Sequence, residues 1–185
     1  MFNAKVGGIV KGKSFEENGV RCFKITNKVE RYNDVLFITG KNTDINKLET
    51  EQPCGKGLHF SDAENILGHC GELDEPFYIR EVTLEKDEDV YIANCGDYRA
   101  RSIIISERKE LFNIDTIKWM KDNGIDIHTR NDYFILSSVI HSNLEVVKYL
   151  VEEEGFDIHT YDDRALELAN IYRKPDIANY IASII

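Results

Sequence analysis

Five histidine and cysteine residues between positions 54 and 95 have the chemistry to hold a metal ion. They are, in chain order, Cys54, His59, His69, Cys70 and Cys95. Zinc ligands usually come as closely spaced pairs, whereas these residues follow one another at spacings of 5, 10, 1 and 25 residues. We therefore predict no metal site. The four scattered cysteines of the chain also indicate reduced thiols and not a disulfide framework.

Nucleophilic and phosphate-binding motifs are the second kind of chemistry to consider. The segment "GKG" at residues 55–57 lacks the spacing of a phosphate-binding P-loop. The sequence also contains no Gly-x-Ser-x-Gly nucleophile elbow. On these grounds we predict no catalytic residue and no cofactor.

Charged and aromatic residues follow a repeated tetrapeptide in the last third of the chain. "DIHT" occurs at 126–129, where "RNDY" follows it, and again at 157–160, where "YDDR" follows it. Tyrosine and arginine are enriched among the residues that contribute most to protein–protein binding. These residue types suit protein recognition if the elements around them leave them exposed.

A period of 31 residues links the two copies of the tetrapeptide, because Gly155 follows Gly124 at that distance. Self-similarity at this period predicts a repeat of two helices. Three segments align as the second helices of such repeats, at 113–124, 143–155 and 174–184. The intervening segments predict first helices at 133–141 and 164–172.

Capping residues agree with these helix positions. Asn143 is a suitable N-cap, and Pro175 falls in a first helical turn, where a missing N–H costs least. Gly124 and Gly155 follow their helices where a left-handed backbone is needed. The segment 143–155 has one more residue before its glycine than the segment upstream.

The repeated segments resemble ankyrin repeats. "YFILSSV" and "RALELAN" stand where that family has its Thr-Pro-Leu-His-x-Ala segment, although neither keeps the Thr-Pro or the His. The segments "LEVVKYLV" and "DIH" are similar to the repeats of ankyrin proteins of the mimivirus-type giant DNA viruses. The resemblance implies an all-α, ankyrin-type helical stack over residues 112–185, with about 2.5 units.

In ankyrin-type repeats the loop tips and first helices form the binding surface, so the resemblance implies where a partner protein would bind. On that mapping, six residues are expected to contact a host or viral protein: Arg130, Asp132, Tyr133, Tyr161, Asp163 and Arg164. For the tetrapeptides themselves there are two interpretations: their residues contact a partner at the loop tips, or, in the second interpretation, which we favour, they shape and join the loops. Their Asp and Thr would close the loops by side-chain to backbone hydrogen bonds, and His128 and His159 would stack between repeats.

Residues 1–111 have a different sequence pattern, in which short segments of β-branched and aromatic residues are separated by turn residues. Strands are predicted at 20–26, 34–40, 57–60, 76–85, 89–94 and 99–106. Ser61 followed by Glu64 reads as a capping box, which predicts one short helix. The predicted fold class is therefore α+β, with a mostly antiparallel sheet domain at 1–111 that precedes the helical repeats.

Two further resemblances concern this N-terminal domain. The stretches "GKGLHFSDAENIL", "YIREVTLEKDEDVYI" and "YRARSIIISERKEL" are similar to segments of the domain that precedes the repeats in many of those viral proteins. The first stretch also resembles the Gly-x-Gly-Ile-Tyr-Phe-Ala-Asp segment of ADP-ribosyltransferases of the poly(ADP-ribose) polymerase type. There His59 would replace the tyrosine that stacks on nicotinamide, and Ser61 would begin the next helix.

The rest of the transferase triad does not match. Ile25, Thr26 and Asn27 stand where that family has its His-Gly-Ser/Thr, and Glu107 is the nearest candidate for its late glutamate. A transferase needs groups that orient the substrate and stabilise developing charge. We therefore predict that the chain is not an enzyme. The alternative is a degenerate ADP-ribosyltransferase-like domain with a cleft beside His59 that binds NAD or ADP-ribose.

Composition limits the partners and the location of the chain. The formal net charge is −10, which disfavours nucleic acid and anionic membranes as partners. We find no apolar run of transmembrane length and no signal peptide, so we expect a non-secreted protein of the host cytoplasm or of the virion.

The leading functional hypothesis is a non-enzymatic protein that binds a host or viral protein through the repeats. The N-terminal domain would serve as a cap or as a second binding module. Oligomeric state is left open, and Ile184 with Ile185 either tuck under the last repeat or contact a partner.

Overall fold

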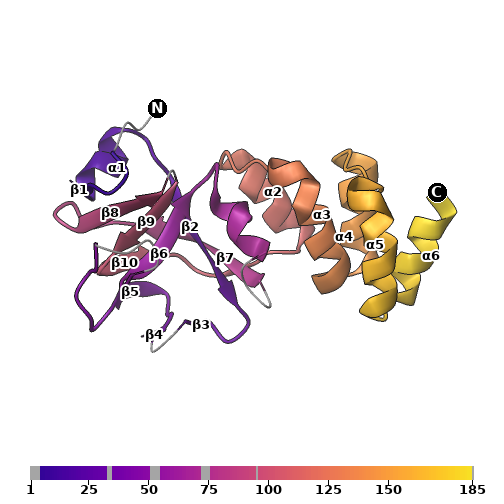
Figure 1. The fold of residues 1–185 in the computed structure, drawn as a ribbon, viewed down its shortest axis with the longest axis horizontal. Helices are drawn as coiled ribbons and strands as arrows, with labels where there is room; N and C mark the ends of the chain where they lie inside the picture. The colour runs from indigo at the N-terminus through magenta and orange to yellow at the C-terminus, as the bar shows by residue number, and fades with distance from the viewer. Residues whose placement is uncertain (1–4, 33–34, 51–54, 72–75, 95, 185) are drawn as a thin grey trace. The chain divides into compact units, whose positions relative to one another are not determined.

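The computed structural model describes residues 5–32, 35–50, 55–71, 76–94 and 96–184 of the chain. The chain divides into two compact units, which Figure 1 colours by position in the sequence. Unit 1 comprises Met1–Ile66 and Tyr78–Lys109, and unit 2 comprises Leu67–Phe77 and Glu110–Ile185. The predicted boundary between residues 111 and 112 stays a prediction.

A nine-stranded sheet in the described residues dominates unit 1. The strand order is β1-β8-β9-β6-β2-β7-β10-β5, with β11 paired to β7. The pairs β1–β8, β8–β9, β9–β6, β6–β2, β7–β10 and β10–β5 are antiparallel. The strands are β1 (Ile9–Lys11), β2 (Cys22–Asn27), β5 (Gly40–Thr43), β6 (Leu58–Asp62), β7 (Pro76–Thr83), β8 (Asp89–Asn94), β9 (Asp97–Ala100), β10 (Ser102–Ile105) and β11 (Lys109–Glu110). A separate hairpin joins β3 (Arg31–Tyr32) to β4 (Val35–Leu36).

Apolar side chains from several strands and one helix form the core of unit 1. Helix α1 (Lys13–Glu17) buries Phe15 alone among its residues. The ring of Phe15 meets the ring of Tyr98 edge-on at 4.9 Å between centroids, and Phe60 lies 5.6 Å from the same tyrosine. These aromatic contacts tie the first helix to the strands in the middle of the sheet.

The predicted helix that begins at Ser61 is wrong. Strand β6 continues through Asp62, and a 3-10 helix, η1, follows at Ile66–Gly71. The Ser61 hydroxyl donates a hydrogen bond to the carbonyl of Gly96, so it is occupied within the sheet and caps no helix. Asp62 instead accepts hydrogen bonds from the backbone N–H of Asn65 at 3.1 Å and from its amide at 2.8 Å. Local sequence shows a capping pattern but not which partner competes for the hydroxyl.

Unit 2 contains the remaining helices of the described residues. Helix α3 contacts α5 and α4, and α6 contacts α5 and α4. The helices are α2 (Ile114–Asp122), α3 (Thr129–His141), α4 (Leu144–Lys148), the π-helical segment η2 (Tyr149–Glu153), α5 (Thr160–Ile171) and α6 (Pro175–Ile184).

The predicted helix caps are confirmed. The Asn143 side chain accepts a hydrogen bond from Val146 N–H at 3.1 Å, as an N-cap does. Pro175 is the first residue of α6. Gly124 and Gly155 have φ values of 78° and 74°, in the left-handed region that glycine adopts without strain.

The additional residue in the second repeat is accommodated by a π-helical turn. In the first repeat Ile125 N–H bonds to Met120 O at 3.0 Å, whereas in the second Phe156 N–H bonds to Leu150 O at 3.0 Å, one residue further apart. The widened turn is η2, because a π-helix bonds each N–H one residue further back than an α-helix.

Glu154, next to this π-helical turn, joins the two repeats. It accepts hydrogen bonds from the ammonium of Lys121 in α2 and from the hydroxyl of Tyr149. Burial tends to raise the pKa of Glu154, but these two donors outweigh it and lower the pKa. Burial, followed by the bond to Glu154, raises the pKa of Tyr149 to about 12.

Successive second helices share a cation–π contact. The ammonium of Lys118 lies 5.6 Å from the ring centroid of Tyr149, and that of Lys148 lies 5.2 Å from the ring of Tyr180. The contact is repeated because the sequence is repeated: Lys118 aligns with Lys148, and Tyr149 aligns with Tyr180.

The predicted fold class is wrong in its C-terminal part. The described residues contain a mostly antiparallel nine-stranded sheet and six short α-helices, which are spread from Lys13 to Ile184 and not confined to one all-α stack. The unit that holds α2 to α6 also takes in Leu67–Phe77. Helical periodicity shows which face of a helix is buried but not which part of the chain covers it. The sheet-rich N-terminal region fits the prediction in part.

Arg173 offers a stability test of the helix ends. It follows α5 with φ of 55°, and the next N–H, of Lys174, bonds back to Ala169 O at 2.8 Å, so it occupies the position that glycine prefers. We expect Arg173→Gly to raise the free energy of unfolding by about 1 kcal/mol, because the left-handed strain is removed. Gly155→Ala should lower it by a similar amount, since no atom lies within 4 Å of an added Cβ there and only backbone strain acts. Urea denaturation measures both, and equal signs for the two variants would contradict the assignment.

Candidate functional site

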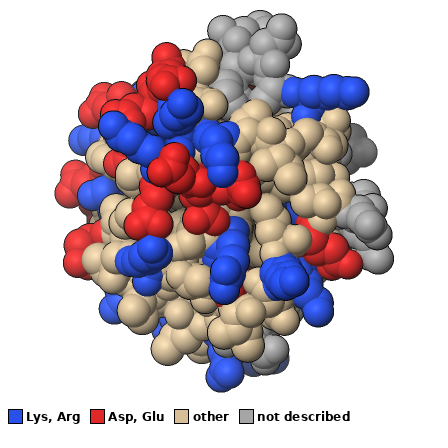
Figure 2. Space-filling model, turned by 90° about the vertical axis from the view of Figure 1, so that its left-hand side faces the viewer, with Lys and Arg blue, Asp and Glu red and all other residues tan. Residues whose placement is uncertain are grey.

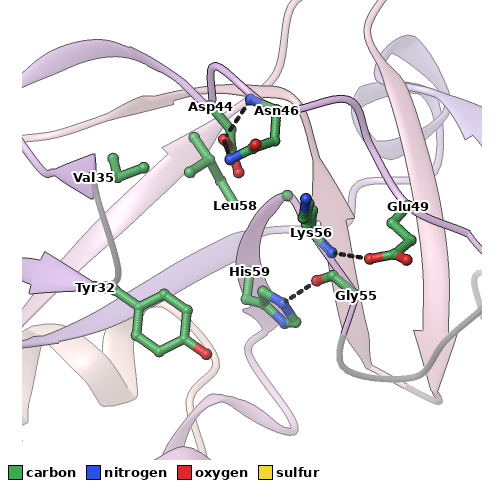
Figure 3. A pocket seen from close by; sticks show the side chains of 10 residues that line it. Tyr32, Val35, Asp44, Asn46, Glu49, Gly55, Lys56, Leu58 and His59 are labelled. Carbon is green, nitrogen blue, oxygen red and sulfur yellow. Dashed lines mark hydrogen bonds between the residues drawn. The ribbon is translucent and has the colours of Figure 1, made fainter.

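A pocket of about 640 Å³ opens beside His59 in unit 1. Strand β6 supplies Leu58 and His59 to its wall, and the turn before that strand supplies Gly55, Lys56 and Gly57. Figure 3 shows Gly55, Lys56, Leu58 and His59 beside the pocket, together with residues from two segments earlier in the chain. The other lining residues are Tyr32, Val35, Asp44, Asn46 and Glu49. The volume lies in the usual range for small-molecule sites.

Two carboxylates face the pocket from different segments. Asp44 is 6% exposed, and its Oδ1 accepts hydrogen bonds from the backbone N–H of Asn46 at 2.8 Å and from its amide at 2.9 Å. The Oε2 of Glu49 accepts the backbone N–H of Lys56 at 3.1 Å. These bonds fix each side chain through one oxygen, so the second oxygen of each carboxylate can accept from a ligand.

Two aromatic rings lie together at another side of the pocket. The rings of Tyr32 and His59 meet edge-on with centroids 6.3 Å apart. His59 Nε2 lies 3.2 Å from the carbonyl of Gly55, which orients the imidazole. Tyr32 is 50% exposed, so much of its surface is open to a bound molecule. The two rings provide a stacking surface beside the carboxylates.

Two buried cations support the wall that carries His59. Lys24 is 7% exposed, donates to the carbonyl of His59 at 2.6 Å and lies 4.4 Å from the ring centroid of Phe37. Burial lowers the pKa of Lys24 to about 8. On the neighbouring strand Arg99 is fully buried, and a Cβ on Gly55 would come within 2.4 Å of its Nη1. Gly55 therefore has to lack a side chain for the guanidinium to fit.

The structure brings only part of the ADP-ribosyltransferase-like pattern to this pocket. The expected cleft beside His59 is present, but Ser61 is buried and bonded to Gly96 O. Ile25, Thr26 and Asn27 belong to β2 and do not line the pocket, and neither does Glu107. The arrangement can hold a small polar molecule, whereas the groups expected for ADP-ribosyl transfer are not assembled in it. Sequence reasoning missed Tyr32, Asp44 and Glu49, because no motif links three segments that only the fold brings together.

The structure does not describe the side chains of the other four candidate metal ligands. Cys54 and Cys95 lie outside the described residues, as do the side chains of His69 and Cys70. Within the described ranges, His, Cys, Asp and Glu side chains form no group of three or more that could hold a metal ion.

The predicted partner-binding residues lie in helical turns and not in loop tips. Helix α3 begins at Thr129 and α5 at Thr160, earlier than predicted, so Arg130, Tyr133 and Tyr161 belong to first helical turns. The same holds for Asp132, and the side chains of these four residues lie outside what the structure describes. The structure therefore places their backbone but does not test their role.

Asp163 and Arg164 are described in full, and both are exposed. Asp163 has φ of 59°, a left-handed value inside α5, just before the predicted helix start at Arg164. Its Oδ1 lies 2.6 Å from Nδ1 of His159, and Arg164 pairs with Glu167. Left-handed backbone at a residue other than glycine is frequently retained at functional positions.

The second interpretation of the "DIHT" segments is confirmed for several of their residues. Asp126 accepts from His128 N–H at 3.0 Å, and Asp157 accepts from His159 N–H at 2.9 Å. The His128 ring stacks on Phe156 of the next repeat, with centroids 4.1 Å apart and planes 21° apart. His159 pairs with Asp163 instead of stacking. The tetrapeptides thus shape the turns and join the repeats.

The surface of unit 1 carries interspersed charges of both signs, as Figure 2 shows for one face. Lys11 pairs with Asp89 and Lys41 with Glu85, each at 2.7 Å. Exposed pairs of this kind contribute little to stability but keep a surface solvated. No helix of the described residues has the length and apolar character needed to cross a bilayer.

Comparison with known proteins finds relatives of this chain in a giant virus. A protein of Acanthamoeba polyphaga mimivirus that carries the name ankyrin repeat protein R896 is 34% identical over 137 residues, covering 70% of this chain and 40% of that protein. Ankyrin repeat protein R229 of the same virus is 31% identical over 116 residues, covering 58% of this chain and 37% of that protein. An uncharacterized protein of the virus, R869, is 27% identical over 135 residues, covering 70% of this chain and 96% of that protein.

The matches cover less than half of the two relatives named for ankyrin repeats. The chain spans 40% and 37% of the lengths of the two relatives named for ankyrin repeats. No protein-family model matches the chain. No solved structure matches it either.

Proposed function

We propose that this chain, which is an ankyrin-repeat protein of the mimivirus type, is a non-enzymatic protein that binds a host or viral protein through its C-terminal repeat units. Ankyrin-repeat relatives indicate protein–protein interaction in general. The finer proposal is that the first turns of α3 and α5 supply the contacts: Arg130, Asp132, Tyr133, Tyr161, Asp163 and Arg164.

The exposure of the second repeat supports this assignment. The side chains of Arg164 and Asp163 are 46% and 56% exposed, so both are available to a partner. Within α5 Asp163 has a left-handed backbone, with φ of 59°, at a residue other than glycine. The net charge of −10 favours basic partner surfaces, since opposite charge speeds encounter at low salt.

The proposal also covers activity and location. A non-enzymatic role is consistent with the position of Ile25, Thr26 and Asn27 in β2, away from the pocket lining. We place the protein in the host cytoplasm or in the virion. Ile184 is 41% exposed and stays a candidate contact, while Ile185 lies outside the described residues.

A capture experiment tests the binding surface. Full-length protein carrying Tyr133→Ala, Tyr161→Ala and Arg164→Ala should recover at least tenfold less partner from host-cell lysate than the unmodified protein, as loss of two or more hot-spot residues implies. Quantitative mass spectrometry measures the recovered partner. The melting temperature should change by only a few degrees, because all three positions lie within the first five residues of α3 and α5.

The matched control changes three exposed residues on other helices. Asp122, Glu145 and Asn179 lie in α2, α4 and α6, and all three are exposed. Alanine at all three should leave capture unchanged. Equal capture by both triple variants would show that the first-turn residues do not form the binding surface.

A further inference from the structure

We propose that the pocket beside His59 binds a polyhydroxylated ring, either a free sugar or the ribose of a nucleotide. This inference concerns unit 1 and is independent of partner binding by the repeats. The pocket is open, is bounded by residues of three separate segments and has a volume of about 640 Å³. A sugar ring with a further substituent fits a cavity of this size.

The carboxylates determine what kind of ligand group fits. Asp44 and Glu49 each use one oxygen to hold a neighbouring N–H, at 2.8 Å from Asn46 and at 3.1 Å from Lys56. Among the described residues the second oxygen of each carboxylate accepts no hydrogen bond, and Figure 3 shows the two carboxylates on different sides of the pocket. Two charged acceptors around one cavity require a ligand with at least two donors, and hydroxyl groups supply short, charge-assisted hydrogen bonds.

The neighbouring cations argue against a positively charged ligand. Lys24 lies 2.6 Å from the carbonyl of His59, and Arg99 lies directly behind Gly55. Lys56 adds a third positive charge at the exposed rim. A cationic ligand would meet these charges, and an anionic group deep in the pocket would meet the carboxylates. A neutral donor of hydrogen bonds satisfies both conditions.

The aromatic pair provides the other half of the recognition. Tyr32 and His59 hold each other edge-on at 6.3 Å, which leaves ring surface open beside the carboxylates. The C–H face of a sugar ring is apolar and its hydroxyls project sideways. Such a ring can therefore lie against Tyr32 while its hydroxyls reach Asp44 or Glu49. If the ring is the ribose of a nucleotide, Lys56 at the rim is suited to pair with its phosphate.

Ligand titration of the full chain tests the proposal. The probes are adenosine, 2′,3′-dideoxyadenosine, ADP-ribose and the methyl glycosides of glucose, mannose and galactose, followed by calorimetry and by ligand-observed NMR. Binding of adenosine and ADP-ribose, with at least tenfold weaker binding of dideoxyadenosine, supports the proposal and assigns the ribose of a nucleotide as the source. Binding of a glycoside without binding of adenosine supports it and assigns a free sugar. Absence of binding by all probes at millimolar concentration, or equal binding of adenosine and its dideoxy analogue, overturns it.

Variants connect the binding to the pocket. Glu49→Gln keeps one oxygen for the N–H of Lys56 and should weaken binding about tenfold, because a neutral acceptor replaces a charged one. Tyr32→Ala, at a half-exposed position, should weaken it to a similar extent without unfolding the protein. Glu17→Gln, an exposed carboxylate in α1, is the matched control and should bind as the unmodified protein does. Unchanged affinity in both pocket variants would overturn the proposal even if a probe binds.

Discussion

Arg80→Met is expected to lower the free energy of unfolding by about 3–5 kcal/mol, the largest single loss predicted for unit 1. Arg80 is 3% exposed and Glu30 is 7% exposed. Two hydrogen bonds of 2.7 Å join the guanidinium to the two carboxylate oxygens of Glu30. Without Arg80 the carboxylate stays buried, and Arg108 is a weaker partner, at 3.4 Å from the carboxylate and with a side chain that is 54% exposed. A buried charge that loses its partner pays most of its desolvation cost.

The double variant separates the cost of the unpaired charge from the value of the pair. Arg80→Met combined with Glu30→Gln should recover most of the loss, because neither charge then remains buried. Lys41→Met is the matched control, since its pair with Glu85 is about half exposed on both sides. It should change stability by less than about 1 kcal/mol. Urea denaturation measures all three, and equal losses for Arg80→Met and Lys41→Met would show that the buried pair is not held as described.

Lys24→Met is expected to stabilise the protein at pH 7, by about 2 kcal/mol. The pKa of Lys24 is about 8 in the folded chain and its ordinary value is 10.5, so at pH 7 the folded state holds a buried ammonium at a cost of about 3 kcal/mol. The substitution also removes the hydrogen bond to the His59 carbonyl, and this loss lowers the free energy of unfolding by about 1 kcal/mol. Methionine has a similar length and suits the position beside Phe37.

The same lysine should make stability depend on pH. Between pH 8 and 10.5 the unfolded chain binds the proton of Lys24 and the folded chain has released it. The unfolded state then binds more protons, so the contribution of Lys24 to the free energy of unfolding rises with pH across this window. The advantage of Lys24→Met should therefore shrink as the pH increases and vanish before pH 10.5. At higher pH the unmodified protein should be the more stable by about 1 kcal/mol, through its hydrogen bond to the His59 carbonyl.

Chemical denaturation of both proteins from pH 7 to 10.5 checks this prediction. Other groups titrate over the same range, so the quantity of interest is the difference between the variant and the unmodified protein. Lys13→Met, at an exposed position in α1, is the control and should show a constant small difference. A Lys24→Met variant that is less stable at pH 7, or a difference that does not change with pH, would contradict a buried ammonium held at a cost.

Capping residues in the sequence correctly predicted four helix ends, although α3 and α5 each begin four residues earlier than predicted. Asn143 is an N-cap, Pro175 begins α6, and Gly124 with Gly155 adopt left-handed backbone, all as expected. Each of these signals depends on atoms within a few residues of one another. The same is true of Asp126, whose side chain accepts an N–H two residues along. Such features can be read from the sequence because no distant segment competes for the groups involved.

Features that depend on contacts between distant segments were predicted wrongly or not at all. Ser61 has the pattern of a capping residue, yet its hydroxyl bonds to Gly96, which the sheet brings beside it. The pocket at His59 was expected only through a resemblance, and its carboxylates Asp44 and Glu49 carry no motif. Their position around one pocket appears only when the segments at 32–35, 44–49 and 55–59 are folded together.

The sequence by itself determined the repeat: its period of 31 residues, its capping residues and its kinship with mimivirus ankyrin-repeat proteins. It also contained the additional residue of the second unit, although only the structure showed that a π-helical turn absorbs it and that Glu154 then bonds to Lys121. The tertiary structure decided which segments make up each unit, which charges are buried together and where a pocket opens. The physical reason is that periodicity and capping act over one or two helical turns, whereas burial and pairing of charges depend on contacts between segments that the sequence does not bring together.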